Sequence, residues 1–159
     1  MSVKSEVIEK LKKYALENKE QPIVIASQGG KTALKLEEEL GKEANIIAIS
    51  EFSYNDGDKK TMKKKKITAL ENADLPLQDL REMRETLLMF DPGVKAALEV
   101  ASIAASKGLV KGKYIAVAGG GKRIDTVLVV NTVHPDSEAI SEPLKQLKVE
   151  KILASPLIQ

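Results

Sequence analysis

The sequence predicts an α/β protein in which helices cover both faces of a mostly parallel β-sheet. Short β-branched runs, such as residues 23–26 and 46–49, alternate with longer helical patterns, and this order is typical of α/β proteins. Both runs are apolar on both faces, as expected for strands buried between two layers of helices. The chain has 159 residues and contains no linker or internal repeat. We therefore expect one domain over residues 1–159.

The first half of the chain alternates between helix and strand. Residues 3–16 place apolar side chains on one helical face and Lys and Glu on the other. Pro22 excludes continuation of this helix and leads into a strand. Gly41 is a typical residue for the end of the second helix. The first half is thus predicted to contain helices at residues 3–16 and 32–40 and strands at residues 23–26 and 46–49.

Residues 50–66 differ from the rest in composition. They contain a turn cluster at residues 55–58 and four consecutive lysines at residues 63–66. We expect a solvated, mobile loop here. Two alternatives remain open: a lid over an anionic ligand, and a nucleic-acid contact through the lysine-rich stretch from Lys59 to Lys66.

The second half continues the alternation. Asp91-Pro92-Gly93 is a turn before an alanine-rich helix. The connection between residues 118 and 126 is too short for a crossover helix, so the strands on its two sides are expected to be antiparallel neighbours. The predicted helices cover residues 75–88, 94–107 and 138–146, and the predicted strands cover residues 67–70 (a short edge piece), 114–118, 126–130 and 149–154.

The composition excludes several classes of function. The net charge is +2, which gives no general reason to expect a nucleic-acid partner. There is no cysteine and only one histidine, so disulfides, thiolate catalysis and His-rich metal sites are excluded. No apolar run is long enough to span a membrane, and no apolar signal core is present near the start, so we expect a cytoplasmic protein. The abundant Lys and Glu residues would suit a thermophile.

The first candidate site is the strand, turn and helix over residues 23–33. Unpaired N–H groups and the positive end of the helix dipole meet where such a helix begins, and this arrangement suits a phosphate. The candidate phosphate-binding residues are Ser27, Gln28, Gly29, Gly30, Lys31 and Thr32. The alternative is structural: the two glycines only form the turn, and Ser27 or Thr32 only caps the helix.

Two better-known nucleotide motifs do not fit this stretch. A P-loop requires a glycine five residues before Gly30, and that position is Ile25. A dinucleotide fingerprint requires Gly-x-Gly-x-x-Gly, which does not occur in the chain. What remains is a shorter cup for one phosphate.

The second candidate site is the glycine turn over residues 119–126. Three consecutive glycines let a ligand approach the backbone closely, and the basic residues after them suit an anion. The candidates for this second wall of the site are Gly119, Gly120, Gly121, Lys122, Asp125 and Thr126. The glycines could equally serve a tight hairpin, with Asp125 hydrogen-bonded to its own loop.

The chain also leaves room for an enzyme whose reaction the sequence does not name. A phosphatase, a lyase and a flavin-dependent activity are the alternatives, and His134, Asp125 and Lys122 are the first residues to consider for them. His134 lies beside Pro135 and Asp136, where a surface loop histidine is expected and an acid–base role is the alternative. No nucleophile–base pair or carboxylate pair can be assigned from spacing.

Two stretches together resemble a known family. The first is Ile-Val-Ile-Ala-Ser-Gln-Gly-Gly-Lys-Thr-Ala at residues 23–33. The second is Ile-Ala-Val-Ala-Gly-Gly-Gly-Lys-Arg-Ile-Asp-Thr at residues 115–126. Both resemble the C-terminal domain of pyruvate kinase, and still more the stand-alone archaeal and bacterial proteins described as pyruvate kinase alpha/beta domain-like. The resemblance implies a three-layer α/β/α sandwich with a mostly parallel five-stranded sheet that contains one antiparallel strand.

The resemblance also implies a type of ligand. In pyruvate kinase the corresponding turn holds a phosphate of an allosteric sugar bisphosphate, which implies phosphate binding by Ser27, Gly29, Gly30, Lys31 and Thr32. Gln28 departs from the enzyme's pattern, so the ligand is left open between flavin mononucleotide (FMN) and another phosphorylated metabolite. Kinase activity is not implied, because the catalytic barrel is absent from this sequence. Self-association is expected, since the related domain mediates contacts in an oligomer.

Overall fold

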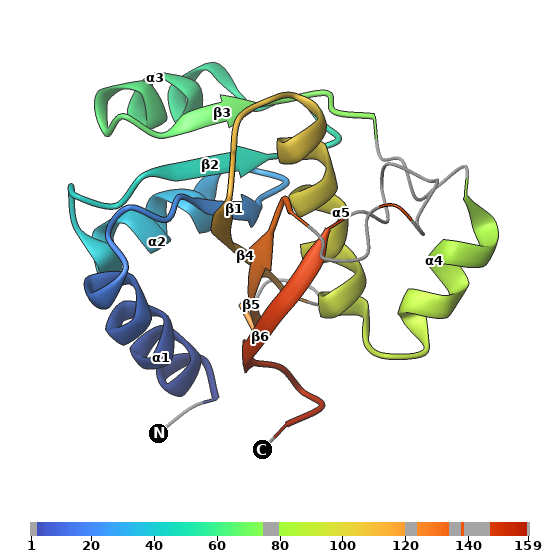
Figure 1. The fold of residues 1–159 in the computed structure, drawn as a ribbon. Helices are drawn as coiled ribbons and strands as arrows, with labels where there is room; N and C mark the ends of the chain where they lie inside the picture. Colours follow the sequence, from blue (N-terminus) through green and yellow to red (C-terminus); the bar gives the residue numbers. More distant parts are fainter. Residues whose placement is uncertain (1–2, 75–79, 120–123, 134–137, 139–146, 159) are drawn as a thin grey trace.

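A computed structural model describes residues 3–74, 80–119, 124–133, 138 and 147–158 of the chain. It shows an α/β fold with one six-stranded sheet in the order β3-β2-β1-β4-β5-β6 (Figure 1). The helices are α1 (Val3–Glu17), α2 (Lys31–Leu40), α3 (Asp56–Lys64), α4 (Arg81–Leu88) and α5 (Pro92–Ser106). The strands are β1 (Ile23–Ala26), β2 (Ile46–Ile49), β3 (Thr68–Leu70), β4 (Lys113–Ala118), β5 (Thr126–Asn131) and β6 (Lys148–Ala154).

The directions of the strands confirm a mostly parallel sheet. Strands β3, β2, β1 and β4 are parallel to their neighbours, and β5 is antiparallel to both β4 and β6. One strand therefore runs against the other five. The five strands that the resemblance implies are one too few. The sixth is the edge strand β3, which pairs with β2 and matches the short edge piece predicted at residues 67–70.

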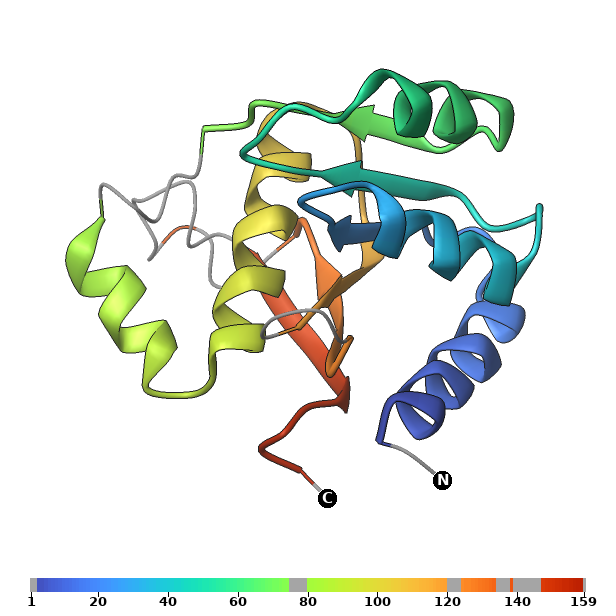
Figure 2. The same cartoon turned by 180° about the vertical axis from the view of Figure 1, so that it is seen from behind.

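Two hydrophobic cores lie on opposite faces of the sheet. Alternate residues of β1 point into different cores: Ile23 and Ile25 pack with α1, α2 and α3, whereas Val24 packs with α5. Figures 1 and 2 show these helices on the two sides of the sheet. Burial of both faces explains the continuous apolar runs in the sequence. The three-layer α/β/α arrangement is therefore confirmed.

The expectation of a mobile loop over residues 50–66 is wrong. Residues 56–64 form α3, whose first turn is capped by Asn55, because the Asn55 Oδ1 atom accepts a hydrogen bond of 2.7 Å from the backbone N–H of Asp58. Met62 is completely buried. The turn cluster in the sequence is in fact a helix start, and Met62 is the buried residue of this helix.

Most other predicted elements agree with the structure. Strands β1 and β2 have the predicted limits, and β4 and β5 are antiparallel neighbours as expected. Helix α5 begins earlier than predicted, at Pro92, because the Asp91 carboxylate caps it by accepting a 2.7 Å hydrogen bond from the Gly93 N–H. The helix predicted at residues 138–146 lies outside the described residues except for Glu138. Within the described part of the chain, no helix has the length and apolar character needed to cross a membrane.

Candidate functional site

The two candidate turns leave neighbouring strands at the same edge of the sheet. The parallel strands β1 and β4 pair Ile25 with Val117. Two residues further on, Ser27 and Gly119 start the two turns at equal height. From there the chain continues from β1 to β2 on one side and from β4 to β5 on the other. At such a point of divergence, at the carboxyl ends of the strands, α/β proteins typically bind ligands in a crevice.

Ser27 holds the first turn from inside. Its side chain is buried, and its Oγ atom accepts a hydrogen bond of 3.3 Å from the backbone N–H of Ala33. Gly30 is the N-cap residue of α2. Its φ is 84°, a left-handed conformation that glycine adopts without strain. Of the two possible caps, the described structure therefore uses Ser27, and the Thr32 hydroxyl makes no capping bond within it.

The start of α2 presents several unused donors. In the described part of the chain, the backbone N–H groups of Gly29, Gly30, Lys31 and Thr32 have no acceptor. Gln28, Gly29 and Lys31 are exposed there, and Lys31 forms no ion pair with any described residue. Free N–H groups at a helix N-terminus carry a partial positive charge. The first turn therefore has the donors that a phosphate requires.

The second wall is described only in part. Gly120, Gly121 and Lys122 lie outside the described residues, and Gly119 is half-buried. Thr126 is completely buried, and its hydroxyl donates a hydrogen bond of 2.8 Å to the Asp125 carboxylate. The Thr126 side chain therefore faces the protein interior rather than the crevice.

Asp125 and Thr126 also lie against the start of α5. A Cβ atom built on Gly93 would be 2.3 Å from Thr126 Oγ1, 2.6 Å from Asp125 Oδ1 and 2.9 Å from Asp91 Oδ2. Two carboxylates thus approach one helix N-terminus, where negative charge is stabilised by the helix dipole. Carboxylates accept hydrogen bonds from hydroxyl groups and repel phosphate.

Three turns at this edge are joined by hydrogen bonds. The Ser50 hydroxyl donates to the Gln28 carbonyl oxygen (3.1 Å) and accepts from the Phe52 N–H (2.9 Å). The Phe52 carbonyl oxygen accepts from the Asn72 N–H (3.1 Å), and the Ser50 carbonyl oxygen accepts from the Ala73 N–H (2.9 Å). We call residues 27–30, 50–54 and 71–74 the rim. Sequence reasoning missed the rim, because its bonds join residues that are far apart in the chain.

Tyr54 connects the rim to α3. Its ring packs beside Gly30, since the Cδ1 atom is 3.4 Å from the position of a Cβ on that glycine. The Tyr54 hydroxyl is buried and has no hydrogen-bond partner among the described residues. The pKa of Tyr54 is raised, mainly by burial and to a lesser degree by the nearby Glu71 carboxylate. The hydroxyl therefore stays protonated and remains a hydrogen-bond donor.

Glu71 fixes the position of Tyr54. Its carboxylate accepts one hydrogen bond of 2.8 Å from Lys59 Nζ and another of 2.8 Å from the Tyr54 N–H. The pKa of Glu71 is lowered, mainly by the hydrogen bond from Lys59 and to a lesser degree by the bond from the Tyr54 N–H. The bond between Lys59 and Glu71 in turn raises the pKa of Lys59. Nothing in the sequence pattern pointed to Glu71, because its partners are brought to it by the pairing of β2 with β3.

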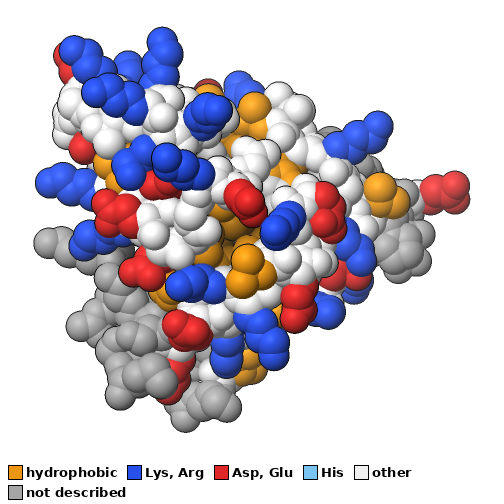
Figure 3. All heavy atoms as spheres, turned by 90° about the vertical axis from the view of Figure 1, so that its left-hand side faces the viewer, with side chains coloured by type: hydrophobic (Ala, Val, Ile, Leu, Met, Phe, Trp, Pro, Cys, Tyr) orange, Lys and Arg blue, Asp and Glu red, His pale blue; other side chains and the backbone are white. Residues whose placement is uncertain are grey.

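The three atoms nearest to a Cβ built on Gly30 belong to Met62, Tyr54 and Asp58, and none of them to a lysine. Gly30 lies against Tyr54, Asp58 and Met62, whereas most of the lysines come later in the helix. Lys65 instead forms an ion pair of 2.9 Å with the buried Glu37 of α2. Figure 3 shows Lys and Arg side chains gathered over α3 at the top of the view. Gly30 is thus close both to Asp58, near the start of α3, and to Met62, near its end.

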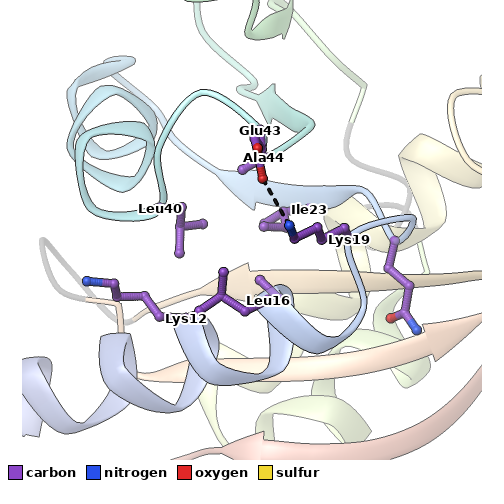
Figure 4. A pocket seen from close by; sticks show the side chains of 9 residues that line it. Lys12, Leu16, Lys19, Ile23, Leu40, Glu43 and Ala44 are labelled. Atoms are coloured by element: carbon purple, nitrogen blue, oxygen red, sulfur yellow. Dashed lines mark ion pairs between the residues drawn. The ribbon is translucent and has the colours of Figure 1, made fainter.

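A separate hollow lies between α1 and α2, at the opposite edge of the sheet (Figure 4). It is lined by Lys12, Ala15, Leu16, Lys19, Gln21, Ile23, Leu40, Glu43 and Ala44. Figure 3 shows hydrophobic side chains surrounded by charged ones on this face. Lys19 and Glu43 form an exposed ion pair of 3.2 Å. The hollow includes no residue of either glycine turn, so it is distinct from the candidate site.

The comparisons with known proteins do not identify the chain. No family model matches it, and no curated protein matches it. His134, the candidate of the enzyme alternative, lies outside the described residues. Within the described residues, no group of three or more His, Asp or Glu side chains could hold a metal ion. The interpretation of the site therefore depends on its geometry.

Proposed function

We propose that the protein binds a phosphorylated small molecule in the crevice between residues 27–32 and 119–126, in a regulatory or metabolite-binding role. The observation that carries the proposal is the start of α2. Four backbone N–H groups without an acceptor in the described chain stand beside an exposed lysine, at the point where β1 and β4 diverge. Convergent N–H donors at a helix N-terminus are a general phosphate-binding arrangement.

Each residue of the first turn has a role in this proposal. The N–H groups of residues 29–32 donate to phosphate oxygens. The Lys31 ammonium and the Thr32 hydroxyl add a charge-assisted bond and a neutral bond. Ser27 is a positioning residue, because its hydroxyl is already bonded to the backbone of Ala33. Gln28 is exposed at the mouth and can contact the rest of the ligand.

The resemblance to the C-terminal domain of pyruvate kinase supports a ligand of this class. A nucleotide such as FMN and a sugar phosphate both combine one phosphate with a hydroxyl-bearing body. We propose no kinase reaction, because the catalytic barrel of pyruvate kinase is not part of these 159 residues.

The test is ligand binding by the variant that combines Lys31→Ala and Thr32→Ala. Native mass spectrometry of the freshly purified protein would reveal a co-purified phosphate ester, and a thermal-shift screen would rank added ones. A ligand at 100 times its Kd stabilises the folded state by about 2.7 kcal/mol. We expect the double variant to lose most of this shift while keeping the melting temperature of the unliganded protein.

Lys35→Ala is the matched control, because Lys35 is an exposed lysine one turn later on the same helix. It should leave the ligand-induced shift unchanged. If the double variant bound the ligand as tightly as the unmodified protein, the site would lie elsewhere. A screen in which no phosphate ester shifted the melting temperature would reduce the glycine turns to structural elements.

A further inference from the structure

Phe52 is an exposed aromatic residue on the rim. Its side chain is 54% exposed, although three of its near neighbours in the chain, Ile49, Ser50 and Tyr54, are buried. The chain has only two phenylalanines. An aromatic ring gives up a large favourable burial energy when it stays in water. What distinguishes Phe52 from the equally exposed Phe90 is its position on the rim, beside the candidate ligand site.

The backbone of Phe52 is held at both polar groups. Its N–H donates to Ser50 Oγ and its carbonyl oxygen accepts from the Asn72 N–H. These two bonds fix the backbone that carries the exposed ring. A rigid backbone under an exposed ring reduces the ordering cost of binding.

The backbone of Phe52 lies close to the first turn. Ser50 Oγ is 3.1 Å from the Gln28 carbonyl oxygen and 2.9 Å from the Phe52 nitrogen. The Phe52 nitrogen is therefore at most the sum of these two distances away from Gln28, which begins the exposed part of the candidate phosphate cup. An exposed aromatic residue thus adjoins the start of the candidate phosphate cup.

We propose that Phe52 is the stacking platform for a planar heteroaromatic ring, so that the ligand is a nucleotide rather than a simple sugar phosphate. This inference rests on the proposed phosphate site. An aromatic side chain stacks on any purine, pyrimidine or isoalloxazine ring, because each has a flat π-face. A sugar phosphate has no such face and would leave Phe52 without a contact of this kind.

Three probes separate the phosphate from the ring: adenosine 5′-monophosphate, FMN and ribose 5-phosphate. Ribose 5-phosphate carries the phosphate and the sugar but no base. Stacking of one base is worth about 1–3 kcal/mol, which corresponds to roughly 5- to 150-fold in Kd. Calorimetry should therefore show that Phe52→Ala weakens adenosine 5′-monophosphate and FMN by this factor. The Kd of ribose 5-phosphate should change by less than about twofold.

Two further variants and one control test whether the aromatic face of Phe52 is the cause of the nucleotide affinity. Phe52→Trp keeps an aromatic face and should retain both nucleotides, whereas Phe52→Leu keeps apolar bulk and should behave like Phe52→Ala. Phe90→Ala is the matched control, because Phe90 is 57% exposed and lies at the turn between α4 and α5. It should leave all three Kd values unchanged.

The outcomes distinguish this inference from the proposed function. Nucleotides that bind no more tightly than ribose 5-phosphate, or a Phe52→Ala variant that weakens all three probes equally, would overturn the platform and leave the phosphate site standing. Absence of binding by all three probes would overturn the phosphate site and the platform together. Loss of all three probes in the Lys31/Thr32 double variant, with loss of only the nucleotides in Phe52→Ala, would support both.

Discussion

Single residues at the carboxyl edge divide into those that build the site and those that remain free for a ligand. The hydroxyl groups of Ser27, Ser50 and Thr126 are all used inside the protein. Lys31 and the backbone N–H groups around it are not used within the described chain. Residue type alone does not make this distinction, because a serine in a glycine turn suits a phosphate as well as it suits a helix cap.

At the residue scale, Glu71 makes stability depend on acid pH. Its pKa is lowered in the folded state, first by Lys59 and then by the Tyr54 N–H. The unfolded chain, with a glutamate pKa of about 4.3, therefore takes up this proton at a higher pH than the folded protein does. The stabilisation is complete when the pH is above the pKa of Glu71 in the unfolded chain. It is lost as the pH falls through the pKa of Glu71 in the folded protein.

We expect Glu71→Gln to remove this part of the acid sensitivity. Urea unfolding at a series of pH values below neutrality should give a shallower loss of stability for the variant than for the unmodified protein. Near neutral pH the variant should be the less stable of the two. Parallel curves for the two proteins would show that the bonds to Glu71 do not persist in solution.

At the scale of elements, the start of α5 is fitted to the end of the second glycine turn. Thr126 and Asp125 of the β4–β5 connection occupy the space where a side chain at position 93 would lie. The helix can approach the sheet this closely only with glycine at that position. The contact fixes one end of the turn whose other residues form the proposed second wall.

Gly93→Ala should therefore be destabilising. A Cβ atom 2.3 Å from Thr126 Oγ1 forces the helix or the strand to move, and overpacking of this kind typically costs about 1–3 kcal/mol. Chemical denaturation measures the change. Gly57→Ala is the control, because Gly57 lies in α3 with its nearest neighbour at an ordinary 3.5 Å, and alanine favours a helix. Equal stability of the two variants would contradict the close contact at α5.

At the scale of the whole molecule, one sheet serves two cores. Ile25 of β1 and Ile49 of β2 are both buried, but they belong to the cores on opposite faces. Because the same backbone hydrogen bonds support both faces, neither core can be lost while the sheet remains intact. We expect the chain to unfold as one cooperative unit.

Ile25→Val and Ile49→Val test this expectation. Each should cost about 0.5–1.5 kcal/mol, and each should shift the same single thermal transition. Calorimetry should give equal calorimetric and van't Hoff enthalpies for both variants. Two separate transitions, of which each variant moved only one, would show that the cores unfold independently.

The sequence predicted elements well where every residue of the element is apolar and buried. It predicted them poorly where only one residue of the element is buried. Strands β1 and β2 were predicted with their observed limits, because their residues are apolar on both faces. Helix α3 was missed, because its lysines and its Asn-Asp-Gly start resemble a loop and only Met62 is buried. Sequence reasoning located the first turn, but the rim and the contact of Thr126 with Gly93 depend on strand order, which the local pattern does not contain.

The position of α1 has a consequence for synthesis of the protein. Val7, Ile8 and Leu11 of α1 share a core with Val127 of β5 and Ala154 of β6. At about 5–20 residues per second, the ribosome needs on the order of ten seconds to add the roughly 140 residues between them. During this interval the apolar face of α1 lacks part of its final packing surface. This core can therefore close only after β6 has left the ribosome.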